Sequence, residues 1–180
     1  MRRLLFVLLA ASSFATSAFA ALQPGAPAPL FTATATLGGN DYPFILADAL
    51  KRGPVVLYFY PAAFTPGCTI EAHDFATAMP QFTALHATVI GVSRDGIAIL
   101  KKFSVSECRS KFPVAADESG IITKEYDATI PTAPAYANRI SYVIAPTGQI
   151  IYTYDDPDPA DHVKNTMAAV KAWDLAHPAP

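Results

Sequence analysis

The run of six apolar residues at 55–60 (VVLYFY) constrains the fold more than any other segment of the chain. It lies between Gly53-Pro54 and Pro61, and it consists of β-branched and aromatic residues. A run of this length without polar alternation indicates a β-strand that is buried on both faces. Such a strand belongs inside a sheet that other elements cover on both sides, as in α/β proteins.

The segments after this strand alternate between helical and strand patterns. A helix is expected from the end of the turn at 65–67 through Met79, and a second helix at 97–106. Strands are expected at 87–92 and 112–116, followed by a helical turn at 120–126.

The C-terminal third predicts a β-hairpin and a final helix. Strands at 140–144 and 150–154 are joined by Pro-Thr-Gly, a turn signal. The helix is expected from Pro159 to about Ala176, with Asp158 as its N-cap. The complete order predicts one α/β domain with a thioredoxin-like fold, in which a mixed central sheet has helices on both faces.

The first twenty residues have the pattern of a secretory signal peptide. Arg2 and Arg3 precede an apolar run at 4–11, and a small-residue segment ends in the A-x-A pattern of residues 18–20. Serine and threonine residues interrupt the run before it reaches the roughly 20 apolar residues of a membrane-spanning helix. We therefore expect cleavage after Ala20, a mature domain at 21–180, and an exported, periplasmic protein without a membrane segment.

The charge of the mature chain argues against a nucleic-acid partner. Loss of Arg2 and Arg3 takes the formal net charge from −2 to −4, whereas nucleic-acid binding calls for a basic face. Four aspartates cluster before the last helix, and we interpret them as turn and cap residues: Asp155, Asp156, Asp158 and Asp161. The glycine and terminal glutamate of a calcium loop are missing there, so no metal and no cofactor is expected.

Cys68 is the residue whose surroundings predict chemistry. The strand–turn–helix pattern puts it in the first turn of a helix, where free backbone N–H groups and the helix dipole stabilise a thiolate over a thiol. A helix end contributes roughly 0.3–1 kcal/mol at an exposed position. A strongly activated thiolate therefore needs a nearby cation as well.

The segment 61–68 (PAAFTPGC) matches the P-x-x-x-T-x-x-C signature of peroxiredoxins, and the chain resembles this family over nearly all of 21–180. Tyr60 before the signature and residues 69–72 (TIEA) after it resemble the bacterioferritin-comigratory, or Q-type, subfamily. Further similar segments lie at 26–31, 89–93 and 138–144, the last of which holds the family's active-site arginine at the head of a strand.

This resemblance implies a thiol-dependent peroxidase that reduces hydrogen peroxide and organic hydroperoxides. Cys68 would be the peroxidatic cysteine, Thr65 would hydrogen-bond the thiolate and the peroxide, and Arg139 would supply the cation. Pro61 would shield the pocket from water, and Glu71 would orient Arg139. The resemblance also implies a thioredoxin-like or other thiol reductant, and a monomer or weak dimer.

Plain structural explanations exist for several of these residues. Thr65 followed by a proline is typical of an ordinary helix N-cap, and Pro61 can simply end a strand. Glu71 can be a solvated acid in the first turns of the helix, and a single arginine such as Arg139 is most often a surface charge.

The recycling of Cys68 is left open by the sequence. Many Q-type members have a resolving cysteine five residues later, where this chain has His73. Cys108, the one other cysteine, can resolve Cys68 through an intramolecular disulfide after local unfolding, or an external thiol can do so. A permanent Cys68–Cys108 bridge is the third possibility, and closing a loop of about 40 residues would contribute roughly 4 kcal/mol.

Two other functions fit the same fold class. A thioredoxin-like disulfide oxidoreductase needs a cysteine at the C-x-x-C offset, where this chain has Glu71. A redox-inactive binding or copper-handling protein needs closely spaced cysteines and a positioned histidine, and neither is evident in the sequence.

Overall fold

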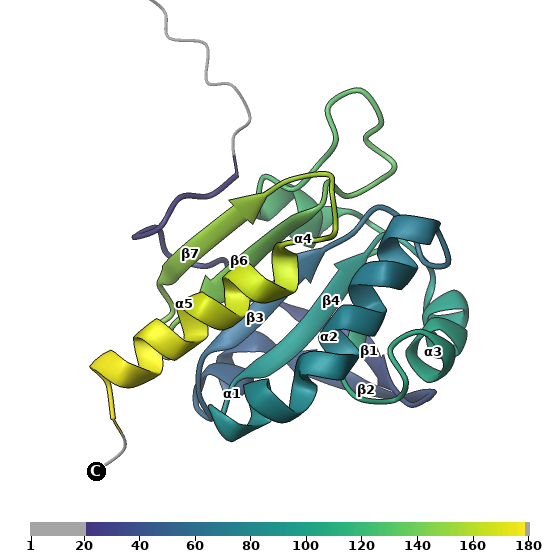
Figure 1. Ribbon diagram of the computed structural model, residues 1–180. Helices are drawn as coiled ribbons and strands as arrows, with labels where there is room; N and C mark the ends of the chain where they lie inside the picture. The colour runs from purple at the N-terminus through teal and green to yellow at the C-terminus, as the bar shows by residue number, and fades with distance from the viewer. Residues whose placement is uncertain (1–20, 179–180) are drawn as a thin grey trace, which may run out of the picture.

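The computed structural model describes residues 21–178, so the predicted signal peptide lies outside the described residues. Its centre is a seven-stranded sheet in the order β2-β1-β5-β4-β3-β6-β7 (Figure 1). The strands are β1 (Thr32–Leu37), β2 (Asn40–Ile45), β3 (Val55–Phe59), β4 (Thr88–Ser93), β5 (Val114–Ala116), β6 (Ile140–Ile144) and β7 (Ile150–Asp155).

The middle of the sheet is parallel and both of its flanks are antiparallel. β3, β4 and β5 run in the same direction, while β6 runs against β3 and β7 runs against β6. On the other side, β1 runs against both β5 and β2. The mixed sheet expected from the sequence is therefore confirmed.

Helices pack on both faces of the sheet. They are α1 (Leu46–Leu50), α2 (Pro66–Ala84), α3 (Ile97–Ser106), α4 (Ile121–Glu125) and α5 (His162–Ala176). The long helices α2 and α5 lie side by side over one face (Figure 1). Within the described residues, no helix is both long enough and apolar enough to cross a membrane.

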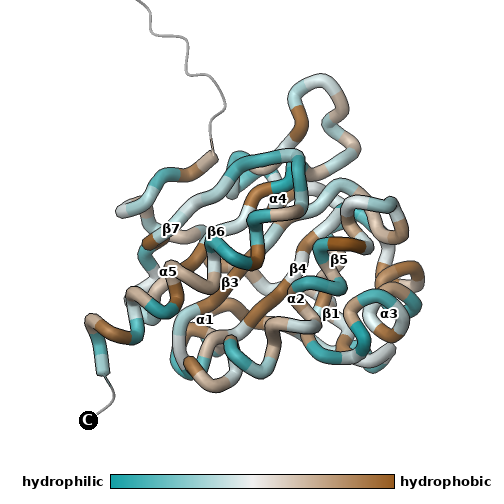
Figure 2. The backbone as a smooth tube through the Cα atoms, viewed as in Figure 1, coloured by the Kyte–Doolittle hydropathy of each residue, from teal (hydrophilic) through white to brown (hydrophobic). Residues whose placement is uncertain are grey.

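The strand β3 is buried on both faces, as its composition predicts. Val55, Leu57 and Phe59 belong to one apolar cluster, which includes residues of α1 and α4. Val56 and Tyr58 point the other way, into a second cluster with residues of α2, α3 and α5. Figure 2 shows hydrophobic segments along the central strands β3 and β4. The two-sided burial of β3 thus divides the core into two layers.

Two parts of the structure differ from the sequence expectation. The elements β1, β2 and α1 were not predicted, and they add an antiparallel pair to one edge of the sheet. The predicted N-cap Asp158 is wrong: α5 begins at His162, and Asp161 is its N-cap. The Asp158 carboxylate accepts a hydrogen bond from Ala160 N (3.0 Å) instead, and this local bond stabilises a turn in place of a helical start. The turn role predicted for the aspartate cluster is confirmed for Asp156 and Asp158, whereas Asp155 is the last residue of β7.

A glycine in β4 makes room for an aromatic ring of the second cluster. A Cβ atom at Gly91 would lie 2.6 Å from Cζ of Tyr58, a distance that forces movement. The Tyr58 ring cannot easily shift, because it stacks on Phe75 with ring centroids 4.5 Å apart and packs edge-on to Phe112.

We expect Gly91→Ala to lower the free energy of unfolding by about 1–3 kcal/mol, the usual effect of overpacking a rigid core. Urea unfolding of both proteins measures this difference. Gly96→Ala is the matched control, since its added Cβ would meet Glu118 atoms only at 3.6 Å. Equal unfolding midpoints for Gly91→Ala and the unmodified protein would contradict the packing described.

Candidate active site

Cys68 lies in the first turn of α2, directly after the loop that leaves β3. Thr65 is the N-cap of the helix with an extended backbone, and Pro66 occupies the first helical position. The first helical hydrogen bond is donated by Thr69 N to Thr65 O (2.9 Å), so the N–H groups of Gly67 and Cys68 precede the helical ladder. The thiol is almost fully buried, with an exposed fraction of 1%. The position at a helix start predicted for Cys68 is confirmed.

Asp95, just beyond the end of β4, holds the loop before α2. Its Oδ2 accepts hydrogen bonds from Ala63 N (2.7 Å) and from Ser93 Oγ (2.8 Å). Within this loop Phe64 has a left-handed backbone (φ 66°), which is unfavourable for a residue with a Cβ atom. The edge of its ring packs against Phe103, with centroids 5.3 Å apart. The sequence analysis missed Asp95, although a carboxylate beyond the end of a strand next to β3 was a usable signal.

Arg139 reaches the thiol from the strand next to β3. It directly precedes β6, and the antiparallel register pairs Ile140 with Phe59, so the start of β6 lies beside the end of β3. Arg139 Nη2 donates a hydrogen bond to Cys68 Sγ (3.5 Å), and Nε donates to Pro157 O (2.9 Å). The cation that the resemblance implied beside Cys68 is therefore present in the structure.

Gly67 allows this close approach. A Cβ atom at this position would lie 3.0 Å from Arg139 Nη2, so any side chain would press on the guanidinium. The sequence analysis expected free backbone N–H groups in this turn but did not predict this steric role for Gly67.

Glu71 is the ionic partner of Arg139. Its Oε2 pairs with Arg139 Nη1, and both side chains are buried. Burial raises the pKa of Glu71 to about 8, and the charge of Arg139 offsets only part of that effect. Burial also opposes the charge on Arg139, but Glu71 and Cys68 outweigh it and raise the pKa of Arg139. The solvated role considered for Glu71 is wrong, because one turn of helix brings it to the buried face beneath Cys68.

His162 is a further buried group behind Glu71, and the sequence analysis assigned it no role. Its Nδ1 lies 3.6 Å from Glu71 Oε1 and 2.8 Å from Ser141 Oγ, and its Nε2 lies 2.9 Å from Asp156 O. Burial lowers the pKa of His162, which favours the neutral ring. The neutral tautomer that fits has Nε2–H donating to Asp156 O and Nδ1 accepting from the Ser141 hydroxyl.

Thr65 and Pro61 lie along the same loop. The Thr65 hydroxyl donates to Ala62 O (2.9 Å), a bond that fixes the turn before α2. Within residues 21–178 the hydroxyl has no hydrogen bond to Cys68, so the role that the resemblance implies for it stays a prediction. Pro61 is half-buried at the end of the β3 segment. Arg139 thus contacts both Cys68 and Glu71, while Thr65 and Pro61 belong to the loop before α2 and have no hydrogen bond to these three side chains among the described residues.

Cys108 is the second buried thiol. It lies in the turn after α3, in the same apolar cluster as Cys68, and both cysteines are free, so the permanent bridge is not formed in this structure. Burial raises the pKa of Cys108, with a smaller contribution from Glu107, so Cys108 is a neutral thiol at neutral pH. In the described part of the chain, no group of three or more His, Cys, Asp or Glu side chains is arranged to hold a metal ion.

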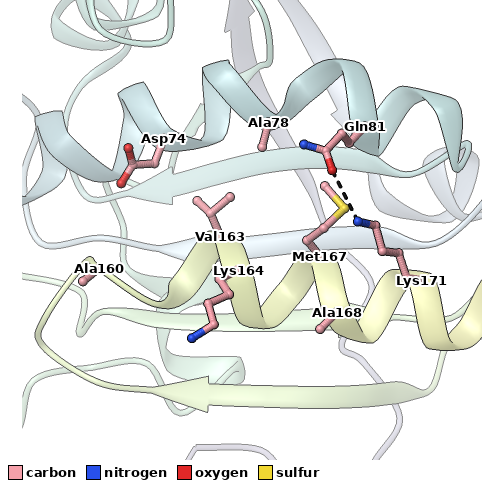
Figure 3. A pocket seen from close by; sticks show the side chains of 9 residues that line it. All are labelled: Asp74, Ala78, Gln81, Ala160, Val163, Lys164, Met167, Ala168 and Lys171. Carbon is pink, nitrogen blue, oxygen red and sulfur yellow. Dashed lines mark hydrogen bonds between the residues drawn. The ribbon is translucent and has the colours of Figure 1, made fainter.

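A groove of about 450 Å³ runs between α2 and α5 beside this site. Figure 3 shows Val163 and Met167 pointing from α5 toward α2, and Lys171 donating to Gln81 Oε1 (3.3 Å) at one end. At its other end is Ala160. The preceding residue, Pro159, lies close to Gly67, since a Cβ atom at Gly67 would be 3.8 Å from Pro159 Cγ. Neither Cys68 nor Arg139 lines the groove, so it flanks the thiol without containing it.

The chain that carries this site has relatives among known proteins. Residues 24–153 match the AhpC/TSA family. The chain belongs to this family.

Its relatives narrow the assignment to the Q-type peroxiredoxins. The chain is 32% identical over 152 residues to a chloroplastic peroxiredoxin Q of Oryza sativa subsp. japonica, covering 84% of this chain and 68% of that protein. It is 29% identical over 152 residues to peroxiredoxin Bcp of Xanthomonas campestris pv. campestris, covering 81% and 92%.

Solved structures agree with these relatives. Peroxidoxin BcpB of Mycobacterium tuberculosis superposes with a TM-score of 0.76 at 26% identity, covering 84% of this chain and 97% of that one. A cysteine-to-serine mutant of PrxQ from Xylella fastidiosa superposes with a TM-score of 0.75 at 25% identity, covering 86% and 98%. This AhpC/TSA protein is therefore a Q-type peroxiredoxin, a thiol-dependent peroxidase with the thioredoxin-like fold. Peroxiredoxins act on peroxides and use thiol reductants such as thioredoxin.

The raised pKa of Glu71 predicts how stability changes with pH. The unfolded carboxyl titrates near its ordinary value of 4.5, whereas the folded one titrates at about 8, so the folded state holds an extra proton between these values. The free energy of unfolding should therefore fall as pH rises through this window, by up to about 1.4 kcal/mol per pH unit. Glu71→Gln should remove this contribution, as measured by urea unfolding at several pH values.

The difference between the two curves isolates Glu71, because His162 and the other titrating groups are common to both proteins. Glu125→Gln, at an exposed position, is the control and should leave the slope unchanged. Parallel curves for Glu71→Gln and the unmodified protein would show that the Glu71 carboxyl titrates normally in the folded state.

Proposed function

We propose that Cys68 is the peroxidatic cysteine of this peroxidase and that Cys108 resolves it through an intramolecular disulfide. The observation that carries the proposal is the contact between the Arg139 guanidinium and the buried sulfur of Cys68 in the first turn of α2. A permanent cation and the free N–H groups of a helix start both favour the thiolate, which is the nucleophilic form.

In the first step the thiolate attacks the nearer oxygen of the peroxide ROOH. The new S–O bond forms as the O–O bond breaks, so sulfur is oxidised and the peroxide is reduced. Cys68 becomes a sulfenic acid, and the leaving RO⁻ takes a proton to become ROH. Arg139 faces the place where negative charge moves from sulfur to oxygen, and a fixed cation in a buried site stabilises that charge.

In the second step the Cys108 thiol attacks the sulfenic sulfur, a disulfide forms, and water leaves. Support comes from the shared apolar cluster of Cys68 and Cys108 and from the residue at 73, a histidine that cannot act as a resolving thiol. An external dithiol of the thioredoxin type then returns both cysteines to thiols.

The cellular setting of this cycle is part of the same proposal. The basic, apolar and small-residue pattern of residues 1–20 supports export to the periplasm with cleavage after Ala20. The reductant would then be a thiol protein outside the cytoplasm. The resemblance to Q-type members supports a monomer or weak dimer.

Replacing the attacking sulfur tests the first step. Cys68→Ser should reduce peroxide consumption to the uncatalysed background, because a hydroxyl is not ionised at neutral pH and is a far weaker nucleophile. The assay follows peroxide loss with a thiol reductant in excess. Ser106→Ala, an exposed substitution on α3, is the control. Equal rates for Cys68→Ser and the unmodified protein would overturn the assignment.

The second step is tested on one turnover. After one equivalent of peroxide, non-reducing mass spectrometry should show the loss of two hydrogen atoms and a peptide that links Cys68 to Cys108. Cys108→Ser should consume that equivalent at the same rate but stop at the sulfenic acid. A stable sulfenic acid in the unmodified protein would instead favour resolution by an external thiol.

A further inference from the structure

The turn that carries Cys108 is fastened to α2 on both sides of the cysteine. Glu107 Oε2 lies 2.9 Å from His73 Nε2, and Arg109 Nη1 donates to Thr77 Oγ1 at 3.5 Å. His73 and Thr77 are four residues apart in the helix and therefore lie on one face of it. The residues immediately before and after the second thiol are thus tied to the helix whose first turn carries the first thiol.

The same turn has an unfavourable backbone. Arg109 and Ser110 both have left-handed conformations, with φ of 50° and 53°, which neither side chain favours. The turn is closed by hydrogen bonds from Ser110 N to Ser104 O and from Lys111 N to Cys108 O, both 2.9 Å. A strained turn persists only where its surroundings hold it, and the contacts with α2 are part of what holds it.

Resolution requires this turn to move. Cys108 is fully buried, and Cys68 is buried among the same aromatic residues and hydrogen-bonded to Arg139. Cys68 and Cys108 are both free and packed in this structure, and a disulfide needs closely spaced Cα atoms and a defined dihedral angle, so we expect both thiols to leave their packed positions by local unfolding. Each contact that holds the turn against α2 raises the free energy of that opening.

We propose that His73 and Glu107, supported by Thr77 and Arg109, form a latch that slows the resolution of the Cys68 sulfenic acid by Cys108. The proposal rests on the resolving role proposed above for Cys108. While the latch is closed, the sulfenic acid persists and a second peroxide can oxidise it. In that reaction a further S–O bond forms to give the sulfinic acid, and ROOH is reduced to ROH. When the latch opens, Cys108 captures the sulfenic sulfur and water leaves.

The latch thus sets how much of the Cys68 sulfenic acid forms the disulfide and how much is oxidised further to the sulfinic acid. The pair is partly exposed, with side-chain exposed fractions of 37% for His73 and 19% for Glu107. It makes no contact with the sulfur or with Arg139 among the described interactions. His73 and Glu107 are therefore positioning residues, and they should affect the second step without affecting the first.

The experiment separates the two steps in quench-flow with one equivalent of hydrogen peroxide. Peroxide loss reports the first step, and disulfide after alkylation reports the second. His73→Ala and Glu107→Ala should each form the disulfide about two- to fivefold faster, the effect of a partly exposed polar pair. The first step should be unchanged, and the sulfinic fraction in excess peroxide should fall.

The double variant distinguishes a latch from general loosening. If the two residues act through each other, His73→Ala with Glu107→Ala should be no faster than either single variant. Ile122→Val, on the opposite face of the sheet, lowers overall stability without touching α2 and should leave the disulfide rate unchanged. Glu125→Ala is the control for loss of one exposed carboxylate.

Three results would overturn the latch, and they differ in what else they overturn. Unchanged or slower disulfide formation in both single variants refutes the latch and leaves Cys108 as the resolving residue. An acceleration in Ile122→Val equal to that in the latch variants also refutes it, since global stability would then control the step. No disulfide in the unmodified protein refutes the resolving role of Cys108 and the latch with it.

Discussion

Arg139 carries a full positive charge in a residue that is only 5% exposed, and the site is built around it. A buried charge is tolerated only when anions and hydrogen-bond acceptors surround it. Here the acceptors are Glu71 from α2, Pro157 from the chain before α5, and the sulfur of Cys68. The cation therefore joins its own position before β6 to α2, which carries both Glu71 and Cys68, and to the chain before α5.

The Glu71 carboxyl and the Cys68 thiol both contact Arg139, so the charge on one affects the electrostatic environment of the other. When Glu71 is ionised it neutralises Arg139, and a thiolate then adds net negative charge to a buried site. When Glu71 holds its proton, the charge of Arg139 is balanced by the thiolate alone. The raised pKa of Glu71 shows that burial favours the protonated form more than Arg139 can oppose. His162, neutral and 3.6 Å from the other carboxylate oxygen, adds no second cation to this balance.

The sequence predicted those features of the fold and site that depend on residues adjacent in the chain. The two-sided strand β3, the helix start at Thr65 and the family signature around Cys68 all follow from residues next to one another. β1 was missed because its apolar residues are mainly alanines, and β2 because it contains Pro43, which is tolerated in an edge strand.

The parts of the site that were missed depend on contacts between distant segments. Asp95, Ser141 and His162 are ordinary polar residues in the sequence, and only the packing of β4, β6 and α5 brings them to the loop and to Glu71. The start of α5 was placed too early because a short-range bond within the aspartate cluster competes with the first helical turn. The sequence shows that these residues are present, but it does not show which distant residue each of them contacts in the fold.

The helix α5 serves different purposes at its two ends. Its first residue, His162, is fully buried beside Glu71, and the chain just before it supplies the carbonyl that accepts from Arg139. At the other end Leu175 is 82% exposed, and the last turn lies away from the site. A fusion partner or affinity tag joined beyond this end of α5 would therefore be attached far from the site (Figure 1). A truncation that removed the whole helix would take away His162, which lies beside Glu71, the partner of Arg139.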